Sequence, residues 1–342
     1  MKLGLGLYDG MVTADNLRFA RQMSATHIVA HLPSAKTFPS TKEGYWSYED
    51  LHGLASFVAE NGLKLEAIEN FAPNLWDQIL LDGPKRAEQM EKLKQTIRNM
   101  GKAGIPVMGY YFSIAGVWGR VRGPFARGGA ESVGFIEDEA PAQTPIPNGE
   151  VWGIKFDENA PAGDIGTVSR EEMWQRLTYF LENLVPVAEE AGVRLAAHPD
   201  DPPLTELRGT GRLITHPDYY QRLLDIVPSH HNGLEFCQGT ITEMPDADPI
   251  DAIRRYAPTG KICYVHFRNV VGKAPNYREV FIDEGDADMI EALRAYRAGG
   301  FEGVMIPDHT PATACAAPWH AGMAFALGYI RAAMNTLDKF EG

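Results

Sequence analysis

The chain has 342 residues, of which 44% are hydrophobic, so it can bury a substantial core and has the composition of an ordinary globular protein. Its 32 basic and 45 acidic side chains give a net charge of −13, which argues against nucleic acid and anionic membranes as partners. Three cysteines are too few for a disulfide framework, so we expect a reducing compartment, with any special cysteine acting as a ligand or nucleophile.

The sequence carries no visible targeting signal. The short apolar stretch at the N-terminus is broken by Gly4, Gly6 and Asp9, and no apolar run approaches the length of a membrane-spanning helix. We therefore expect a cytoplasmic protein without a membrane partner. The sequence leaves open whether the chain forms homo-oligomers.

Short apolar runs typical of buried strands alternate with longer amphipathic stretches typical of helices. The predicted strands span 3–8, 27–32, 63–68, 106–110, 194–197, 233–236, 261–265 and 303–306. The predicted helices span 14–23, 47–60, 84–104, 170–191, 216–226, 248–256, 286–298 and 319–337. This alternation predicts an α/β fold, a (β/α)8 TIM barrel formed as a single domain by residues 1–342. A doubly wound open sheet is the alternative, but the turn after the first strand lacks the Gly-rich phosphate-binding fingerprint.

The segment 111–168 interrupts this alternation of predicted strands and helices. It is rich in Gly and Pro and is too long for a plain connection between a strand and a helix. We interpret it as an insertion after the fourth strand that covers the active site.

Four potential metal ligands lie at the ends of consecutive predicted strands. The fifth to eighth strands end at His198, Cys237, His266 and Asp308. In a TIM barrel the carboxyl ends of the strands meet at one rim, where the functional groups lie. Two imidazoles, a thiolate and a carboxylate there indicate a metal site, compatible with Zn²⁺, Mn²⁺, Fe²⁺ or Co²⁺. Because the ligands come from separate strands and not from short paired knuckles, we expect a catalytic metal.

Polar and aromatic residues near these ligands are candidates for contacts with the substrate. Arg268 and Asn269 follow His266, and the guanidinium fork of Arg268 matches a carboxylate, although a salt bridge at the rim would also explain it. His309 is a candidate general acid or base, or alternatively a residue that holds the neighbouring aspartate. Trp118 and Arg120 in the insertion are expected to line a lid, although Trp118 could instead be a local packing nucleus.

Several segments resemble the mannonate dehydratase family, metal-dependent barrel enzymes of the xylose isomerase-like type. They are AAHPDDPP at 196–203, GLEFCQGT at 233–240, YVHFRNV at 264–270, REVFIDEGDADM at 278–289 and PDHTP at 307–311. Further similar segments occur in the same order, so the resemblance covers most of the chain. It implies a hydro-lyase that uses Mn²⁺ or Fe²⁺, with Co²⁺ or Zn²⁺ as further options, to convert D-mannonate or a related aldonate into 2-keto-3-deoxy-D-gluconate.

The resemblance also assigns residues one position at a time. The family's metal ligands fall on His198, Cys237, His266 and Asp308, the four residues that the strand ends select independently. Its catalytic histidine falls on His309.

The chain departs from the family pattern on the side of the substrate. The family's catalytic tyrosine ahead of the last helix falls on His320, which we take as a second proton-transfer candidate. An asparagine after the fourth strand is Tyr111 here, and the family's segment after Glu69 is replaced by residues 70–75.

Two other functions remain open on the sequence. A metal-dependent isomerase or epimerase of sugars or uronates could use the same barrel and the same ligands. A non-catalytic metal- or sugar-binding relative is also compatible with the change of the family's tyrosine to His320.

Overall fold

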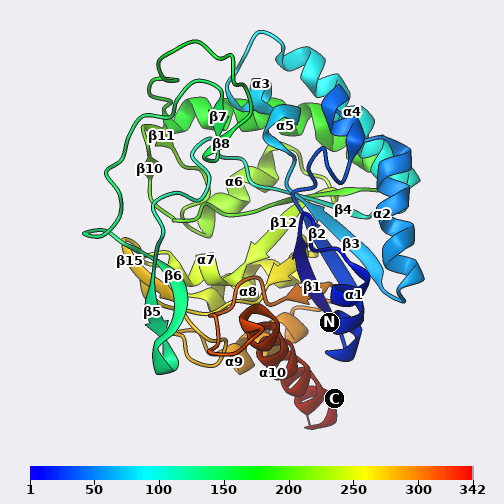
Figure 1. Cartoon of the computed structure of the whole chain (residues 1–342), viewed down its shortest axis with the longest axis vertical. Helices are drawn as coiled ribbons and strands as arrows, with labels where there is room; N and C mark the ends of the chain where they lie inside the picture. Colours follow the sequence, from blue (N-terminus) through cyan, green and yellow to red (C-terminus); the bar gives the residue numbers. More distant parts are fainter. Residues whose placement is uncertain (341–342) are drawn as a thin grey trace.

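The structure is a computed structural model and describes residues 1–340. Within this range eight parallel strands close into a barrel in the order β1-β16-β13-β12-β9-β4-β3-β2, with helices packed around it (Figure 1). The barrel strands are β1 (Lys2–Tyr8), β2 (His27–His31), β3 (Lys64–Glu69), β4 (Val107–Tyr110), β9 (Arg194–Ala197), β12 (Asn232–Cys237), β13 (Ile262–His266) and β16 (Val304–Ile306). The predicted (β/α)8 barrel is confirmed, and each barrel strand coincides with one predicted strand.

Helices connect the strands and cover the outside of the barrel. The α-helices are α1 (Ala14–Gln22), α2 (Tyr48–Glu60), α3 (Asp77–Leu80), α4 (Arg86–Lys102), α5 (Arg170–Ala191), α6 (Asp218–Ile226), α7 (Gln238–Glu243), α8 (Pro249–Tyr256), α9 (Met289–Ala298) and α10 (Pro318–Phe340). Short 3-10 helices are η1 (Pro39–Glu43), η2 (Pro73–Leu75), η3 (Arg127–Gly129) and η4 (Ala257–Thr259). Helix α5 shows how local sequence fixes the boundaries: Ser169 and Glu172 form a capping box, and Gly192 ends the helix with a φ of 68°.

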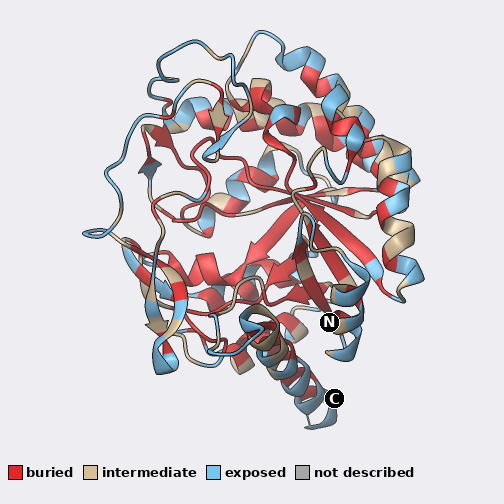
Figure 2. Ribbon diagram, viewed as in Figure 1, coloured by how far each residue is buried: buried red, intermediate tan, exposed pale blue. Residues whose placement is uncertain are grey.

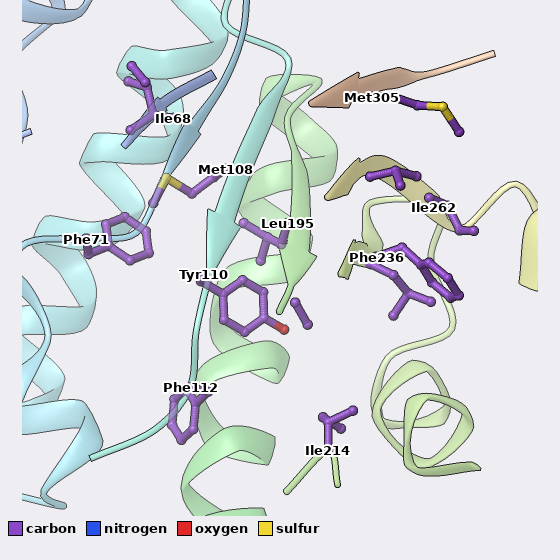
Figure 3. Packing of buried hydrophobic residues seen from close by; sticks show 14 of the residues in the cluster. Ile68, Phe71, Met108, Tyr110, Phe112, Leu195, Ile214, Phe236, Ile262 and Met305 are labelled. Atoms are coloured by element: carbon purple, nitrogen blue, oxygen red, sulfur yellow. The ribbon is translucent and has the colours of Figure 1, made fainter. Parts of the chain in front are cut away.

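Side chains on the barrel strands alternate between the barrel interior and the helical layer, as the pleat of a strand requires. On β4, Val107 faces the interior cluster whereas Met108 packs in the outer core; on β9, Ala196 and Leu195 divide in the same way. Figure 3 shows part of the outer core, where Met108, Leu195 and Phe236 leave their strands toward the helices. The strands and the inward faces of the helices are buried (Figure 2). This alternation decides which polar residues enter the barrel.

The segment between β4 and α5 holds four further strands that do not join the barrel. They are β5 (Val121–Ala126), β6 (Ala130–Ile136), β7 (Glu150–Val151) and β8 (Ile154–Lys155). The hairpin β5–β6 pairs with a second hairpin, formed by β14 (Val270–Lys273) and β15 (Asn276–Glu279) in the loop after β13. The result is an antiparallel sheet of order β14-β15-β6-β5 beside the barrel (Figure 1), which the sequence did not predict. A short hairpin of β10 (Glu206–Leu207) and β11 (Thr210–Gly211) follows β9.

Among the helices of residues 1–340, none combines the length and the apolar character that a membrane span requires.

Candidate metal centre and active site

Three of the predicted ligands come together at the carboxyl ends of neighbouring strands. Ligand atoms of His198, Cys237 and His266 all lie within 4.8 Å of one another. Asp308 follows β16 directly, and its Oδ2 lies 3.5 Å from Nδ1 of His266. Asp308 has a positive φ of 64°, a conformation that aspartate tolerates better than most residues. Donors at these separations are close enough to share one ion.

The hydrogen bonds of the two histidines leave one ring nitrogen of each available as a ligand. Nδ1 of His198 lies 2.6 Å from the carbonyl oxygen of Pro199 and donates to it, so Nε2 is the nitrogen that can bind a metal. Nε2 of His266 faces carboxylate oxygens of Glu69 at 3.1 Å and Glu235 at 3.2 Å, whereas its buried Nδ1 has no hydrogen-bond partner within residues 1–340. Second-sphere carbonyls and carboxylates orient metal-binding histidines in this way. The donor set therefore fits a divalent metal.

The charges around the site favour a thiolate at position 237. Burial raises the pKa of Cys237, but Arg268, His198 and His266 oppose burial and hold that pKa well below its usual range. Burial lowers the pKa of His198, yet Glu235 and Cys237 raise it to about 9. A thiolate is the form of cysteine that binds metals.

A polar cluster lies inside the barrel beneath the candidate ligands. Glu235 and Tyr264 are two residues before Cys237 and His266 on their strands, so they point to the same interior face. The Tyr264 hydroxyl donates to Glu69 over 3.3 Å. Burial, with a contribution from Glu69, raises the pKa of Glu235 to about 8. These carboxylates therefore lie where they orient His266.

His309 lies beside the candidate metal centre and is held by a buried carboxylate. Its Nδ1 lies 3.0 Å and 3.1 Å from the two oxygens of Glu279, and its Nε2 lies 3.3 Å from the hydroxyl of Tyr8. Burial lowers the pKa of His309, but Asp308 and Glu279 reverse this effect and raise it. A histidine fixed through Nδ1 presents Nε2 for proton transfer.

A cavity of about 620 Å³ opens next to these residues. It is lined by Tyr8, Arg120, Arg122, Glu131, Ser132, Val133, Glu279, Asp308, His309, Thr310, Ala312, Pro318, Trp319 and Met323. Residues of the insertion thus line this cavity together with Asp308 and His309. This volume falls in the range of small-molecule sites.

Arg268 and Asn269 are buried and do not line this cavity. The guanidinium of Arg268 is 2% exposed and forms ion pairs with Asp201 and Glu243 at 3.2 Å, with Asp308 at 3.1 Å, and with Glu279. Within residues 1–340, the hydrogen bonds of the Asn269 side chain go to backbone groups. This geometry agrees with the alternative that Arg268 forms salt bridges, except that its ion pairs are buried and do not lie at the rim. A direct contact of either residue with a substrate carboxylate has no support in this placement.

The two insertion residues also have different surroundings. Arg120 lines the cavity and forms ion pairs with Asp201 and, at 3.4 Å, with Glu279. Trp118 packs on the outer core, with the guanidinium carbon of Arg208 5.5 Å from its ring centre. The packing alternative therefore fits Trp118 better than a place in the cavity wall.

His320 is separated from the other candidates. It lies at the start of α10, but its ring packs edge-on against Phe19, with the ring centres 5.0 Å apart, and Nε2 lies 3.0 Å from Oδ1 of Asn16. These two partners of His320 lie on α1; its ring also lies 4.8 Å from that of Trp319, which lines the cavity, whereas His320 does not. Its alignment with the family's tyrosine does not bring it to the position of a proton-transfer group.

Several residues of this region escaped the sequence analysis. Tyr8, His31 and Glu69 end the strands β1, β2 and β3, so the strand-end rule could have selected them. Glu279 lies on a hairpin outside the barrel, and nothing in the sequence pattern places it near His309.

Comparisons with known proteins agree in one family. A model of the D-mannonate dehydratase (UxuA) family matches residues 8–338. Mannonate dehydratase 2 of Halalkalibacterium halodurans is 30% identical over 277 residues, covering 78% of this chain and 79% of the relative. Mannonate dehydratase of Thermotoga maritima is 32% identical over 282 residues, covering 77% and 78%.

A solved structure supports the same assignment. The crystal structure of mannonate dehydratase from Streptococcus suis serotype 2 superposes with a TM-score of 0.83 at 26% identity, covering 100% of this chain and 96% of that one. The match over nearly the whole length includes the barrel and the loops that carry the candidate site. The chain therefore belongs to the D-mannonate dehydratase family of hydro-lyases.

Proposed function

We propose that this enzyme dehydrates D-mannonate, or a closely related aldonate, to 2-keto-3-deoxy-D-gluconate. One observation carries the proposal: His198, Cys237, His266 and Asp308 converge beside His309 at the edge of a cavity. Family membership favours dehydration over the isomerase and epimerase alternatives and over a non-catalytic role.

The residues of the candidate centre would hold Mn²⁺ or Fe²⁺, with Co²⁺ and Zn²⁺ as alternatives. The chemistry that a bound divalent cation supplies is Lewis acidity, which stabilises the negative charge that develops when a proton leaves the carbon beside a carboxylate. Cys237 must remain a reduced thiolate to act as a ligand, so we propose a cytoplasmic location.

His309 would act on the substrate as a proton-transfer group through Nε2. Glu279 accepts the Nδ1 proton and fixes the ring, so that Nε2 points toward Tyr8 in the cavity wall. His309 follows the candidate ligand Asp308 and lines the cavity, so a substrate bound through its carboxylate and C2 oxygen at the metal centre would present its C2 proton near this imidazole. We therefore assign removal of the C2 proton to His309.

The insertion 111–168 would cover this site. Arg120, Arg122 and Ser132 contribute to the cavity wall from the hairpin region. Arg120 is held by buried carboxylates, whereas the Arg122 side chain is 72% exposed and paired at 3.4 Å with the exposed Glu131. Arg122 is thus the cavity cation most free to turn toward a substrate anion.

The proposed function is tested by incubating the Mn²⁺-loaded and Fe²⁺-loaded protein with a panel of aldonates and uronates. We expect a 2-keto-3-deoxy product from D-mannonate or a near relative. An isomerised or epimerised product, formed without loss of water, would show that the protein is an isomerase or epimerase and not a dehydratase. Absence of any conversion across the panel, with metal bound, would favour a binding role.

A further inference from the structure

Two histidines flank Tyr8 at the barrel rim, and each is held by a buried glutamate. The Tyr8 hydroxyl lies 3.3 Å from Nε2 of His309, while the Tyr8 ring meets the His31 ring edge-on with centres 4.6 Å apart. Nδ1 of His31 lies 2.8 Å from Oε1 of Glu69, much as Nδ1 of His309 lies 3.0 Å from Glu279. The site therefore contains two similar glutamate–histidine pairs.

The barrel register places the second pair at the same rim as the candidate ligands. Tyr8 pairs with His31 across β1 and β2, and His31 pairs with Glu69 across β2 and β3. These three residues end their strands, as Cys237 and His266 do. The other oxygen of Glu69 lies 3.1 Å from Nε2 of His266, so one carboxylate spans the distance between His31 and a candidate ligand.

His31 is open to a cavity, unlike most of the groups around it. Its side chain is 23% exposed and lines a cavity of about 330 Å³. Tyr8 lines both this cavity and the 620 Å³ cavity that contains His309. Tyr8 thus lines both cavities, with one histidine in each. A substrate that occupied both cavities around Tyr8 would face one imidazole in each.

Dehydration of an aldonate needs two proton transfers on adjacent carbons. The C2–H bond breaks and its proton goes to a base, while the C3–O bond breaks and the hydroxyl takes a proton to leave as water. A double bond forms between C2 and C3, and the resulting enol becomes the 2-keto product by moving the proton of its C2 oxygen to C3. The reaction requires no oxidant or reductant.

We propose that His31, held by Glu69, is the general acid that protonates the leaving C3 hydroxyl. This inference rests on the proposed function, in which His309 removes the C2 proton. Glu69 accepts the Nδ1 proton of His31 and so leaves Nε2 to carry the proton that is donated. His31 replaces His320 as the second proton-transfer group, since the contacts of His320 face Asn16 and Phe19.

The test compares His31→Asn with His309→Asn in the full-length, Mn²⁺-loaded protein. The control is His230→Asn, which changes an exposed histidine just before β12, at the opposite end of the barrel. Metal content and Tm are measured first, so that a variant that has lost the metal or the fold is recognised. Each protein then receives D-mannonate in D₂O and, separately, 3-deoxy-3-fluoro-D-mannonate, whose fluoride depends far less on protonation to leave.

For His31→Asn we expect dehydration to fall at least about 100-fold while C2 deuterium exchange and fluoride release continue. For His309→Asn we expect exchange and fluoride release to be lost together, and for His230→Asn no change. Dehydration within threefold of wild type in His31→Asn, or loss of fluoride release along with it, would overturn the assignment. Loss of metal in His31→Asn would also overturn it and give His31 a role in building the centre. If wild-type protein neither dehydrates mannonate nor releases fluoride, the proposed function itself fails.

Discussion

Cys237 and His266 are register partners on the adjacent parallel strands β12 and β13. Both end their strands, so the thiol and the imidazole leave the sheet at the same level and on the same side. This pairing makes the distance between the two groups a property of the barrel itself. Loss of either side chain should therefore alter the site without altering the strands.

Replacing Cys237 with Ser should remove the bound metal and the activity together. The hydroxyl of serine stays protonated near neutral pH and is a poor substitute for a thiolate ligand. Metal content after dialysis, measured by elemental analysis, checks this. The matched control is Cys263→Ser, because Cys263 is also buried on β13 but belongs to the apolar interior cluster. Equal metal content in wild type and Cys237→Ser would contradict the ligand assignment.

Substitution of Glu279 with Gln should lower kcat with little change in KM. The amide cannot accept the Nδ1 proton of His309 as a carboxylate does, and loss of such second-sphere partners typically costs about 10- to 100-fold. Steady-state kinetics on the metal-loaded enzyme measure both constants. A KM increase with an unchanged kcat would instead place Glu279 in substrate binding.

His309→Asn should lower kcat by more than Glu279→Gln does, by about 10²- to 10⁴-fold.

Arg268→Met should destabilise the protein, and Arg122→Gln should weaken substrate binding. Removing Arg268 leaves its carboxylate partners buried without their cation, which typically costs about 3–5 kcal/mol of unfolding free energy. In the described part of the chain Arg122 pairs with the exposed Glu131, so its loss should leave Tm unchanged and raise KM about tenfold. Urea unfolding and KM measurements separate the two effects. An unchanged KM in Arg122→Gln would exclude Arg122 as an anion contact.

The stabilising effect of Asp201 should depend on pH on the acid side. Burial raises the pKa of Asp201, but Arg120 and Arg268 outweigh burial and hold it below the usual value. A lowered folded-state pKa means that this contribution is complete above the unfolded pKa of about 3.9 and is lost as the pH falls through the folded value.

Asp201→Asn should therefore be less stable than wild type at pH 7, with the difference shrinking below a pH of about 4. Chemical unfolding of both proteins across this range measures the difference. A constant gap between the two proteins from pH 7 to pH 3 would show that the carboxylate charge is not responsible.

The barrel could be predicted from the sequence because the residue patterns that define its strands and helices are local and periodic. Strand 107–110 reads as a short apolar run, and the helix 170–191 begins at the capping residue Ser169. The candidate ligands followed from one further rule, that the carboxyl ends of parallel strands share a rim. Strand runs, helix caps and strand ends can all be recognised from residues that are neighbours in the sequence.

The supporting residues could not be predicted in the same way. The pairing of Glu279 with His309 depends on how the hairpin β14–β15 lies against β6, which is a long-range contact. The burial of Arg268 depends on carboxylates that follow different barrel strands, including Asp201 after β9 and Glu243 on α7 after β12. The sequence shows which charged residues are present but not which of them form ion pairs in the fold. The surroundings of His320 could not be predicted for the same reason, because an alignment does not show which residues a helix face contacts.

The pairing of β6 with β15 joins two loops of the barrel that lie far apart in the chain. Residues 130–136 belong to the loop after the fourth barrel strand, whereas residues 276–279 belong to the loop after the seventh. If either hairpin were shortened or exchanged, the other would be left with an unpaired edge, which invites aggregation. Changes of specificity in this enzyme should therefore require compensating changes in both loops, and a grafted loop should succeed only when its partner is transferred with it.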